Sequence, residues 1–263
     1  VLDQPSLKVL EYDFEGKCLG ITNISNFWAN KLFVIGDYLY LVNQGSDTNN
    51  GRYSIFEIKK DGAMTEAFIP FENASGLDCD HCYARYSAES VFYAQRESNT
   101  IYKVSEGSCE PFLTLDFGDY TLPDKLKGLD ARELMFKTNK EYQKYALGIE
   151  EIQVSGDLLF VKFQAKQENY LLVINHKNKT NVLLCRGISI NSMYSIGLMN
   201  YYIDNDLIYN VCDVDDFVDL VTNMLNDKRP IGDKYVKQLK SILSERYSDS
   251  GNPIIIKYKV RHE

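Results

Sequence analysis

Two short stretches of the sequence carry residue types that could perform metal or redox chemistry. The first is Cys79-Asp80-His81-Cys82, which places two thiols, an imidazole and a carboxylate within four residues. C-x-x-C spacing serves redox exchange in some proteins and supplies half of a zinc site in others. A zinc site needs a second ligand pair, yet His176 and His262 are isolated. A redox motif of the thioredoxin type stands at a helix start in a βαβ unit, and the sequence pattern lacks such a unit. We therefore expect a loop disulfide or plain loop thiols, and keep Cys79 and Cys82 as weak metal or redox candidates.

The second stretch is acidic. Asp213, Asp215 and Asp216 are followed closely by Asp219, and hard cations such as calcium take clustered carboxylate oxygens. However, acidic residues ahead of an apolar helical stripe also cap free N–H groups and favour the helix dipole. No glycine supplies the sharp turn of an EF-hand loop. Helix capping is the expectation here, and the three aspartates stay weak calcium candidates.

Familiar catalytic motifs give no further support for an enzyme. Asp116-Phe117-Gly118 copies a kinase tripeptide without the glycine-rich loop or the catalytic loop that accompany it in kinases. Neither G-x-S-x-G nor H-E-x-x-H occurs. The sequence predicts no catalytic residues and no cofactor.

Aromatic residues are the better candidates for binding, because rings offer rigid contact area at low entropic cost. The chain has 19 Tyr, 13 Phe and a single Trp. Four tyrosines alternate within predicted strands and are expected to be structural: Tyr38, Tyr40, Tyr93 and Tyr102. Five aromatic residues lie in less regular segments and are the candidate ligand-binding residues: Phe27, Trp28, Tyr194, Tyr201 and Tyr202.

The composition of the chain argues against several classes of binding partner. The formal net charge of −8 and the absence of a basic run argue against nucleic acid binding. No apolar stretch approaches the roughly 18 to 20 residues that span a bilayer. The six cysteines are mostly far apart and irregularly spaced, which favours free or buried thiols over a disulfide framework.

The elements that must position these residues form an internal repeat. A polar turn with Asp or Glu leads into an apolar or aromatic strand, and a second strand with period-2 character follows. The first strand of the repeat is expected at residues 36–42, 89–93, 156–161 and 205–209. The second is expected at residues 53–58, 100–104, 170–174 and 254–260. In three copies a further short strand is expected, at residues 67–70, 112–115 and 182–184.

Successive hairpins at a spacing of about 50 residues are typical of β-propeller blades, in which stacked sheets cover one another. A β-sandwich is the alternative. Helical periodicity interrupts the β pattern and predicts insertions near residues 130–148, 217–225 and 235–243. Residues 7–17 resemble a second strand and its turn without a first strand. We expect an all-β fold, a propeller of four-stranded blades with about four and a half blades visible, forming a single domain over residues 1–263.

Several short sequence segments resemble those of a known family. They are residues 12–17 (Tyr-Asp-Phe-Glu-Gly-Lys), 100–104, 115–123 (Leu-Asp-Phe-Gly-Asp-Tyr-Thr-Leu-Pro) and 252–258. The chain resembles the six-bladed β-propellers related to the NHL type, found largely as secreted lipoproteins of anaerobic gut bacteria. The resemblance covers nearly the whole chain. Family members usually carry a lipoprotein signal and about two further blades ahead of the segment that begins at Tyr12.

The resemblance implies an uncharacterised, extracytoplasmic protein of the cell envelope, with a lipid anchor possible in its precursor. It implies no catalytic residue. The leading hypothesis is a binding or scaffold module for a peptide, a glycan or a protein partner. The alternative is a propeller enzyme of the lactonase or lyase type, with carboxylates or calcium at the central axis.

Overall fold

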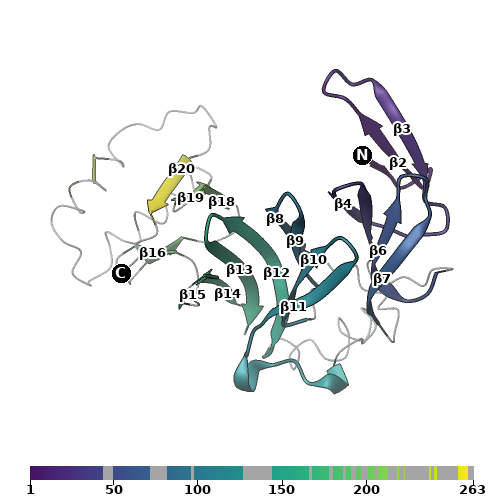
Figure 1. The fold of residues 1–263 in the computed structure, drawn as a ribbon. Coiled ribbons are helices and arrows are strands. Elements are labelled where there is room, and N and C mark those ends of the chain that lie inside the picture. The colour runs from purple at the N-terminus through teal and green to yellow at the C-terminus, as the bar shows by residue number, and fades with distance from the viewer. Residues whose placement is uncertain are drawn as a thin grey trace. The chain divides into compact units, whose positions relative to one another are not determined.

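The computed structural model describes residues 1–43, 50–71, 82–95, 98–126, 144–165, 168–177, 180–185, 188–190, 194–196, 201–204, 207–212 and 254–259, together with Val218, Thr222, Lys237, Lys240 and Ser241. Its regular elements are almost all strands, arranged in antiparallel sheets (Figure 1). No helix among these residues is long and apolar enough to cross a membrane.

The strands follow one another in sequence order within each sheet. The first sheet has three strands: β1 (Leu2–Asp3), β2 (Lys8–Tyr12) and β3 (Cys18–Asn23). The second has four: β4 (Lys31–Ile35), β5 (Tyr38–Val42), β6 (Tyr53–Lys59) and β7 (Met64–Pro70). The third has four: β8 (Cys82–Ser87), β9 (Ser90–Ala94), β10 (Thr100–Ser105) and β11 (Ser108–Thr114).

Two short 3₁₀ helices follow the third sheet: η1 (Gly118–Tyr120) and η2 (Asp124–Leu126). The fourth sheet contains β12 (Ala146–Ser155), β13 (Leu158–Ala165), β14 (Glu168–Asn175) and β15 (Thr180–Cys185). Two smaller sheets complete the described chain: β16 (Ile188–Ile190) with β17 (Tyr194–Ile196), and β18 (Tyr201–Asp204) with β19 (Leu207–Cys212) and β20 (Ile254–Lys259).

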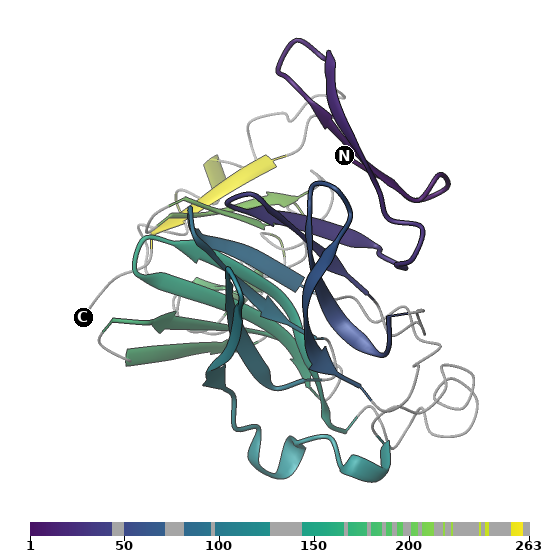
Figure 2. The ribbon, with the colours of Figure 1, turned by 45° about the vertical axis from the view of Figure 1, so that its right-hand side comes forward.

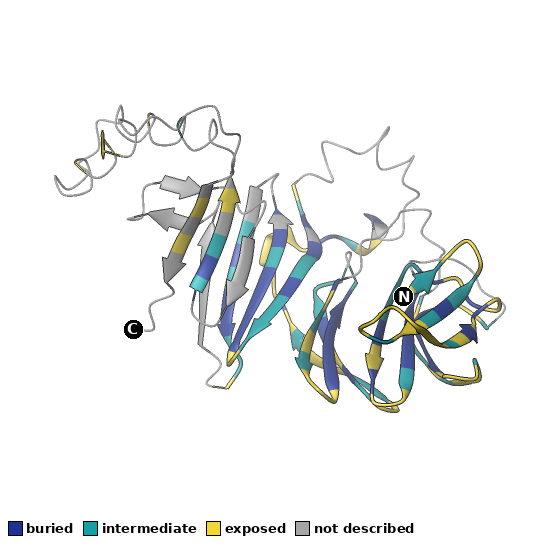
Figure 3. Ribbon diagram, turned by 90° about the horizontal axis from the view of Figure 1, so that it is seen from above, coloured by how far each residue is buried: buried dark blue, intermediate teal, exposed yellow. Residues whose placement is uncertain are grey.

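The chain separates into two compact units, of which the first comprises residues 1–154 and 160–168 and the second residues 155–159 and 169–263. In the first unit, the second sheet is buried on both faces because the side chains of its strands alternate. Leu39 and Leu41 of β5 join a core cluster with the first sheet, whereas Tyr40 and Val42 join a cluster with the third sheet. Dark blue bands mark the buried positions in Figure 3.

The predicted repeat is confirmed as a set of antiparallel sheets in an all-β fold, with four strands in three copies and three described strands in the copy that contains β19 and β20. Each predicted first strand pairs with its predicted second strand, in β5–β6, β9–β10, β13–β14 and β19–β20. The expectation that residues 7–17 lack a first strand is wrong, because the two-residue strand β1 pairs with β2. Figure 2 shows the N-terminal sheet in purple. A closed propeller ring and a single domain over residues 1–263 stay predictions.

The predicted helical insertions lie mostly outside the described residues. Val218, Thr222, Lys237, Lys240 and Ser241, which fall in the second and third insertions, are helical. The first insertion does not extend to Gly148 as expected, because β12 already begins at Ala146.

Candidate binding site

Trp28 lies in the loop of residues 24–30, which joins β3 to β4. The loop begins with a turn at Ser25 and Asn26, and from Phe27 to Ala29 buried and exposed residues alternate. Phe27 and Ala29 are each 5% exposed and belong to the core cluster beneath the loop, whereas Trp28 is 52% exposed. The Phe27 ring packs on Phe56 with ring centroids 5.2 Å apart. Phe27, predicted to bind ligand, thus serves packing, and Trp28 presents its indole to solvent.

Hydrogen bonds hold this loop at several points along its backbone. Two of them are backbone bonds: the Phe27 N–H donates to the Ile24 carbonyl (2.8 Å), and the Asn30 N–H donates to the Val42 carbonyl (3.0 Å). Two others come from side-chain amides, of Gln4 to the Ala29 carbonyl (3.1 Å) and of Asn50 to the Asn26 carbonyl (3.2 Å). The indole is therefore carried on a fixed support, which lowers the entropic cost of binding to it.

The turn beneath the loop contains a strained residue. Leu7 has a φ of 52°, a left-handed conformation that costs a non-glycine residue roughly 1–2 kcal/mol. The strained turn supports the loop, because the Leu7 carbonyl accepts the Ile24 N–H at 2.9 Å. The first residue of this turn, Gln4, makes the bond to Ala29 already described.

Asn30 has a buried polar atom without a partner. Its side-chain oxygen Oδ1 is inaccessible to solvent and accepts no hydrogen bond, although the residue as a whole is partly exposed. A buried acceptor left unpaired costs about 1–3 kcal/mol. Asn30 lies two residues after Trp28, beyond the buried Ala29 and directly before β4.

A second group of contacts joins the edge strands of three successive sheets. Tyr83 and Arg85 of β8 donate to two carbonyls of β4: the Tyr83 hydroxyl to Leu32 at 3.0 Å, and the Arg85 guanidinium to Val34 at 2.6 Å. The thiol of Cys82, also on β8, lies 3.9 Å from the Ile149 carbonyl of β12. The first strands of the second, third and fourth sheets are thus neighbours.

The carboxylate of Glu57 is buried between the second and third sheets and is 2% exposed. It accepts three hydrogen bonds: from the Tyr40 hydroxyl (2.5 Å), the Thr65 hydroxyl (2.6 Å) and the Gly107 N–H (2.8 Å). Burial, followed by the bond to Glu57, raises the pKa of the Tyr40 phenol. This group therefore connects the two sheets through neutral donors and one acceptor.

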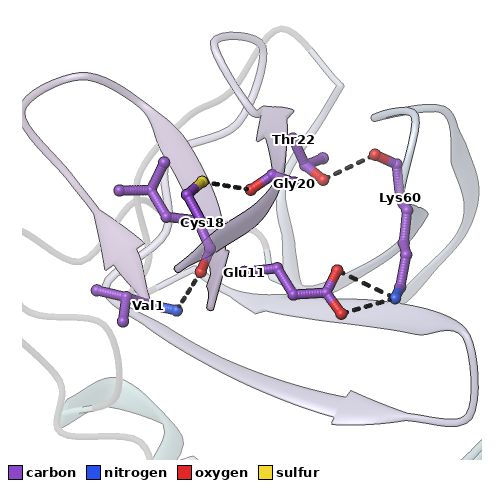
Figure 4. A network of polar contacts seen from close by, with 7 residues as sticks. Val1, Glu11, Cys18, Gly20, Thr22 and Lys60 are labelled. Carbon is purple, nitrogen blue, oxygen red and sulfur yellow. Dashed lines mark hydrogen bonds and ion pairs between the residues drawn. The ribbon is translucent and has the colours of Figure 1, made fainter. Parts of the chain in front are cut away.

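Polar contacts also link the first and second sheets, between β3 and β2 on one side and the β6–β7 turn on the other (Figure 4). The Thr22 hydroxyl donates to the Lys60 carbonyl at 2.7 Å. The Lys60 ammonium lies 3.1 Å from the Glu11 carboxylate, but both side chains are about half exposed, so the ion pair adds little stability. Gly62 in the same turn passes so close to β3 that a Cβ atom would lie 2.8 Å from the Asn23 carbonyl.

Three described cysteines, Cys18, Cys82 and Cys109, are free thiols. Cys82 begins β8, where burial raises the pKa of its thiol to about 12. Burial also raises the pKa of Cys109 to about 12. A thiol held in its protonated form is a poor redox nucleophile and a poor metal ligand. Cys79 lies outside the described residues.

The other predicted site residues are placed only in part. Tyr194 lies on β17, and Tyr201 and Tyr202 lie on β18. Asp213, Asp215 and Asp216 fall outside the described residues. Within the part of the chain that the structure describes, no three His, Cys, Asp or Glu side chains gather closely enough to hold a metal ion.

Sequence reasoning missed Asn30, Glu57 and the pair of Tyr83 and Arg85. Glu57 stands within the apolar run of residues 53–58, and a charged residue inside a buried strand is a signal of a satisfied polar group. The unpaired oxygen of Asn30 and the contacts of Tyr83 and Arg85 with β4 depend on which strands become neighbours. No local sequence pattern indicates which strands become neighbours.

Together these features define an all-β protein of successive antiparallel sheets with an exposed tryptophan on a supported loop. Residues 1–259 match the family described as a domain of unknown function, DUF4934, and the chain belongs to this family. No curated protein matches it.

One similar solved structure is a "putative exported protein" from Bacteroides fragilis NCTC 9343. The two chains superpose with a TM-score of 0.68 at 16% sequence identity, over 99% of this chain and 73% of the other. At this identity the likeness shows the fold alone. Membership of the six-bladed, NHL-related propellers stays a prediction.

Proposed function

We propose that this protein is an extracytoplasmic binding module of the cell envelope, built as a β-propeller and without chemistry of its own. The observation that carries the proposal is the half-exposed indole of Trp28, held on a loop that four hydrogen bonds support. Tryptophan offers a large, rigid contact surface with one polar N–H, and it is enriched among the residues that dominate binding energies.

The arrangement of edge strands supports the propeller. In a propeller the first strand of each blade lies nearest the axis, so the first strands of consecutive blades become neighbours. The contacts of β8 with β4 and with β12 fit this arrangement. Face-to-face packing of consecutive sheets, seen in both core clusters of the first unit, fits it as well.

The location outside the cytoplasm is supported by the Bacteroides fragilis protein, which is described as exported and shares the fold. The location at the cell envelope and a lipid anchor in the precursor rest on the family resemblance of the sequence phrases alone.

A binding screen tests the function without assuming a ligand. Biotinylated protein is applied to an array of oligosaccharides and to an array of linear peptides, and retained ligands are measured by biolayer interferometry. We expect at least one ligand class to bind, with affinity at least ten-fold weaker for Trp28→Ala. Phe14→Ala removes a different aromatic ring, which is fully exposed at the β2–β3 turn, and is the matched control. Retention of no ligand, or equal retention by Trp28→Ala, would contradict the proposal.

A further inference from the structure

Within residues 27–30, Trp28 is half exposed and Asn30 is partly exposed, and we refer to these two side chains as the Trp28–Asn30 face. Phe27 and Ala29, which alternate with them along the chain, are buried in the core. Trp28 offers a flat apolar surface, and Asn30 offers an acceptor with no existing hydrogen bond. A ligand that lies on the indole and donates a hydrogen bond two residues further along satisfies both.

The amide of Asn30 is suited to move outward to such a ligand. Its backbone N–H stays bonded to Val42, so the residue itself is fixed. The side chain is partly exposed, and turning the oxygen towards solvent breaks no hydrogen bond at that atom. An incoming hydroxyl would therefore relieve an unfavourable contact rather than compete with an existing one.

The polarity of the surroundings indicates a neutral ligand. The segment Ile24-Ser25-Asn26-Phe27-Trp28-Ala29-Asn30 has no charged residue, and the side chains that bond to it, Gln4 and Asn50, are neutral amides. Cations bound by aromatic rings gain from more than one ring or from a carboxylate beside the ring. The second ring of this segment, Phe27, is buried.

An extended peptide is disfavoured at the neighbouring strand. Peptides commonly add to the open edge of a sheet through backbone hydrogen bonds. The strand that follows this loop is the edge strand β4, and its carbonyls at Leu32 and Val34 already accept bonds from Tyr83 and Arg85. Backbone pairing at those two positions would require these bonds to break.

We infer that the Trp28–Asn30 face binds a neutral oligosaccharide, with the apolar face of one sugar ring on the indole and a sugar hydroxyl donating to the Asn30 oxygen. Sugar rings combine an apolar C–H face with several hydroxyls, which matches a flat aromatic surface beside an unpaired acceptor. This inference rests on the proposed binding function and names its ligand class.

The single tryptophan of the chain makes the test direct, since all indole fluorescence reports on this face. The purified full chain is titrated with cellohexaose, maltohexaose, xylohexaose and N-acetylchitohexaose. We expect a saturable blue shift and a change of intensity with at least one of them. The same sugar should bind Asn30→Ala about ten-fold or more weakly, and Phe14→Ala with unchanged affinity.

Asn30→Ala carries a second readout that a purely structural residue would not give. Removing an unpaired amide should leave the thermal unfolding temperature unchanged or raise it, while binding weakens. A lower unfolding temperature together with unchanged sugar affinity would overturn the role of Asn30.

The outcomes separate the ligand class from the function. A peptide that shifts the Trp28 emission, while no oligosaccharide does, overturns the sugar inference and leaves the binding function standing. An oligosaccharide that binds equally well to Trp28→Ala, measured by calorimetry, places its site elsewhere and also overturns the inference. Binding of neither class overturns both proposals.

Discussion

At the scale of single residues, Glu57 shows how a buried charge can be accommodated. Its carboxylate accepts three donors and is opposed by no other described acidic side chain in hydrogen-bond contact. Burying a carboxylate is costly unless its oxygens are hydrogen-bonded, and here both oxygens are. The Gly107 N–H therefore depends on Glu57 for its hydrogen bond, whereas the Tyr40 hydroxyl also lies 3.2 Å from the Ser105 carbonyl.

Replacing Glu57 by glutamine tests this dependence. Gln has one acceptor oxygen and one amide donor, so the amide would face at least one of the three donors. We expect Glu57→Gln to lower the free energy of unfolding by about 1–3 kcal/mol in urea titrations. The control is Glu66→Gln, because Glu66 lies opposite Glu57 on β7 but is exposed. Equal effects of both substitutions would argue against the role of the network.

The free thiols are predicted to differ widely in reactivity. Cys18 is exposed, whereas burial raises the pKa of Cys82 to about 12, and only the thiolate is alkylated. We expect iodoacetamide at pH 8 to modify Cys18 at least about 100-fold faster than Cys82, followed at the peptide level by mass spectrometry. In denaturant the two rates should converge. Comparable rates in the folded protein would show that Cys82 is accessible.

From the buried thiols of Cys82 and Cys109 we expect a loss of stability at alkaline pH. The pKa values of Cys82 and Cys109 in the folded protein, about 12, lie above the ordinary value for a thiol, so the folded state retains protons that the unfolded state releases. Their contribution is complete below about pH 8.5 and declines as pH rises towards 12. We expect the free energy of unfolding to fall between pH 8 and pH 11. The fall should be smaller in Cys82→Ala, measured relative to its own value at pH 8.

At the scale of elements, the turns decide how closely the sheets approach. Gly62, in the β6–β7 turn, and Gly16, in the β2–β3 turn, share nearly the same left-handed φ, 87° and 84°. A Cβ atom at position 62 would meet the Asn23 carbonyl at 2.8 Å, whereas a Cβ at position 16 would meet nothing within 4 Å. Comparing alanine substitutions at these two positions therefore separates the cost of backbone strain from the cost of a steric clash.

We expect Gly16→Ala to destabilise the protein by about 1 kcal/mol, from the conformational cost alone. Gly62→Ala should cost at least about 1 kcal/mol more, because the turn must also move away from β3. Urea unfolding of the two variants measures the difference. If both lose the same free energy, the contact between the β6–β7 turn and the first sheet is looser than the structure indicates.

Local pattern predicted the central hairpins of the sheets and also the last strands β7, β11 and β15, but it missed the strands that open the sheets. Strands such as β5 and β6 carry the alternation of apolar residues and a polar turn, which is local information. β4 and β12 were not identified, although Gly36-Asp37 and Gly156-Asp157 stand between two apolar runs and indicate a two-residue hairpin turn. Of the two residues proposed to bind ligand, Trp28 is a candidate from the sequence, and its binding role stays a prediction. Asn30 could not be predicted, because an unpaired oxygen results from the packing of neighbouring segments.

At the scale of the whole molecule, the first unit is held together by the second sheet, whose central strands β5 and β6 are buried on both faces. Leu41 and Phe56 of the second sheet are fully buried against the first sheet, and Ile55 is fully buried against the third. Because β1 has only two residues, the first sheet is little more than the hairpin β2–β3. A two-stranded hairpin is marginally stable alone, so the first sheet requires this contact. The three sheets should therefore open together.

Hydrogen exchange tests that coupling. Leu41→Ala leaves a cavity on the face that covers the first sheet and should cost about 2–5 kcal/mol. Because the second sheet is shared, we expect faster amide exchange by mass spectrometry in β2 and β3, and a similar acceleration in β9 and β10 on the far side. Val34→Ala, on an exposed position of β4, should change neither. Acceleration confined to β2 and β3 would mean that the first sheet opens by itself and that the stacked sheets are separate cooperative units.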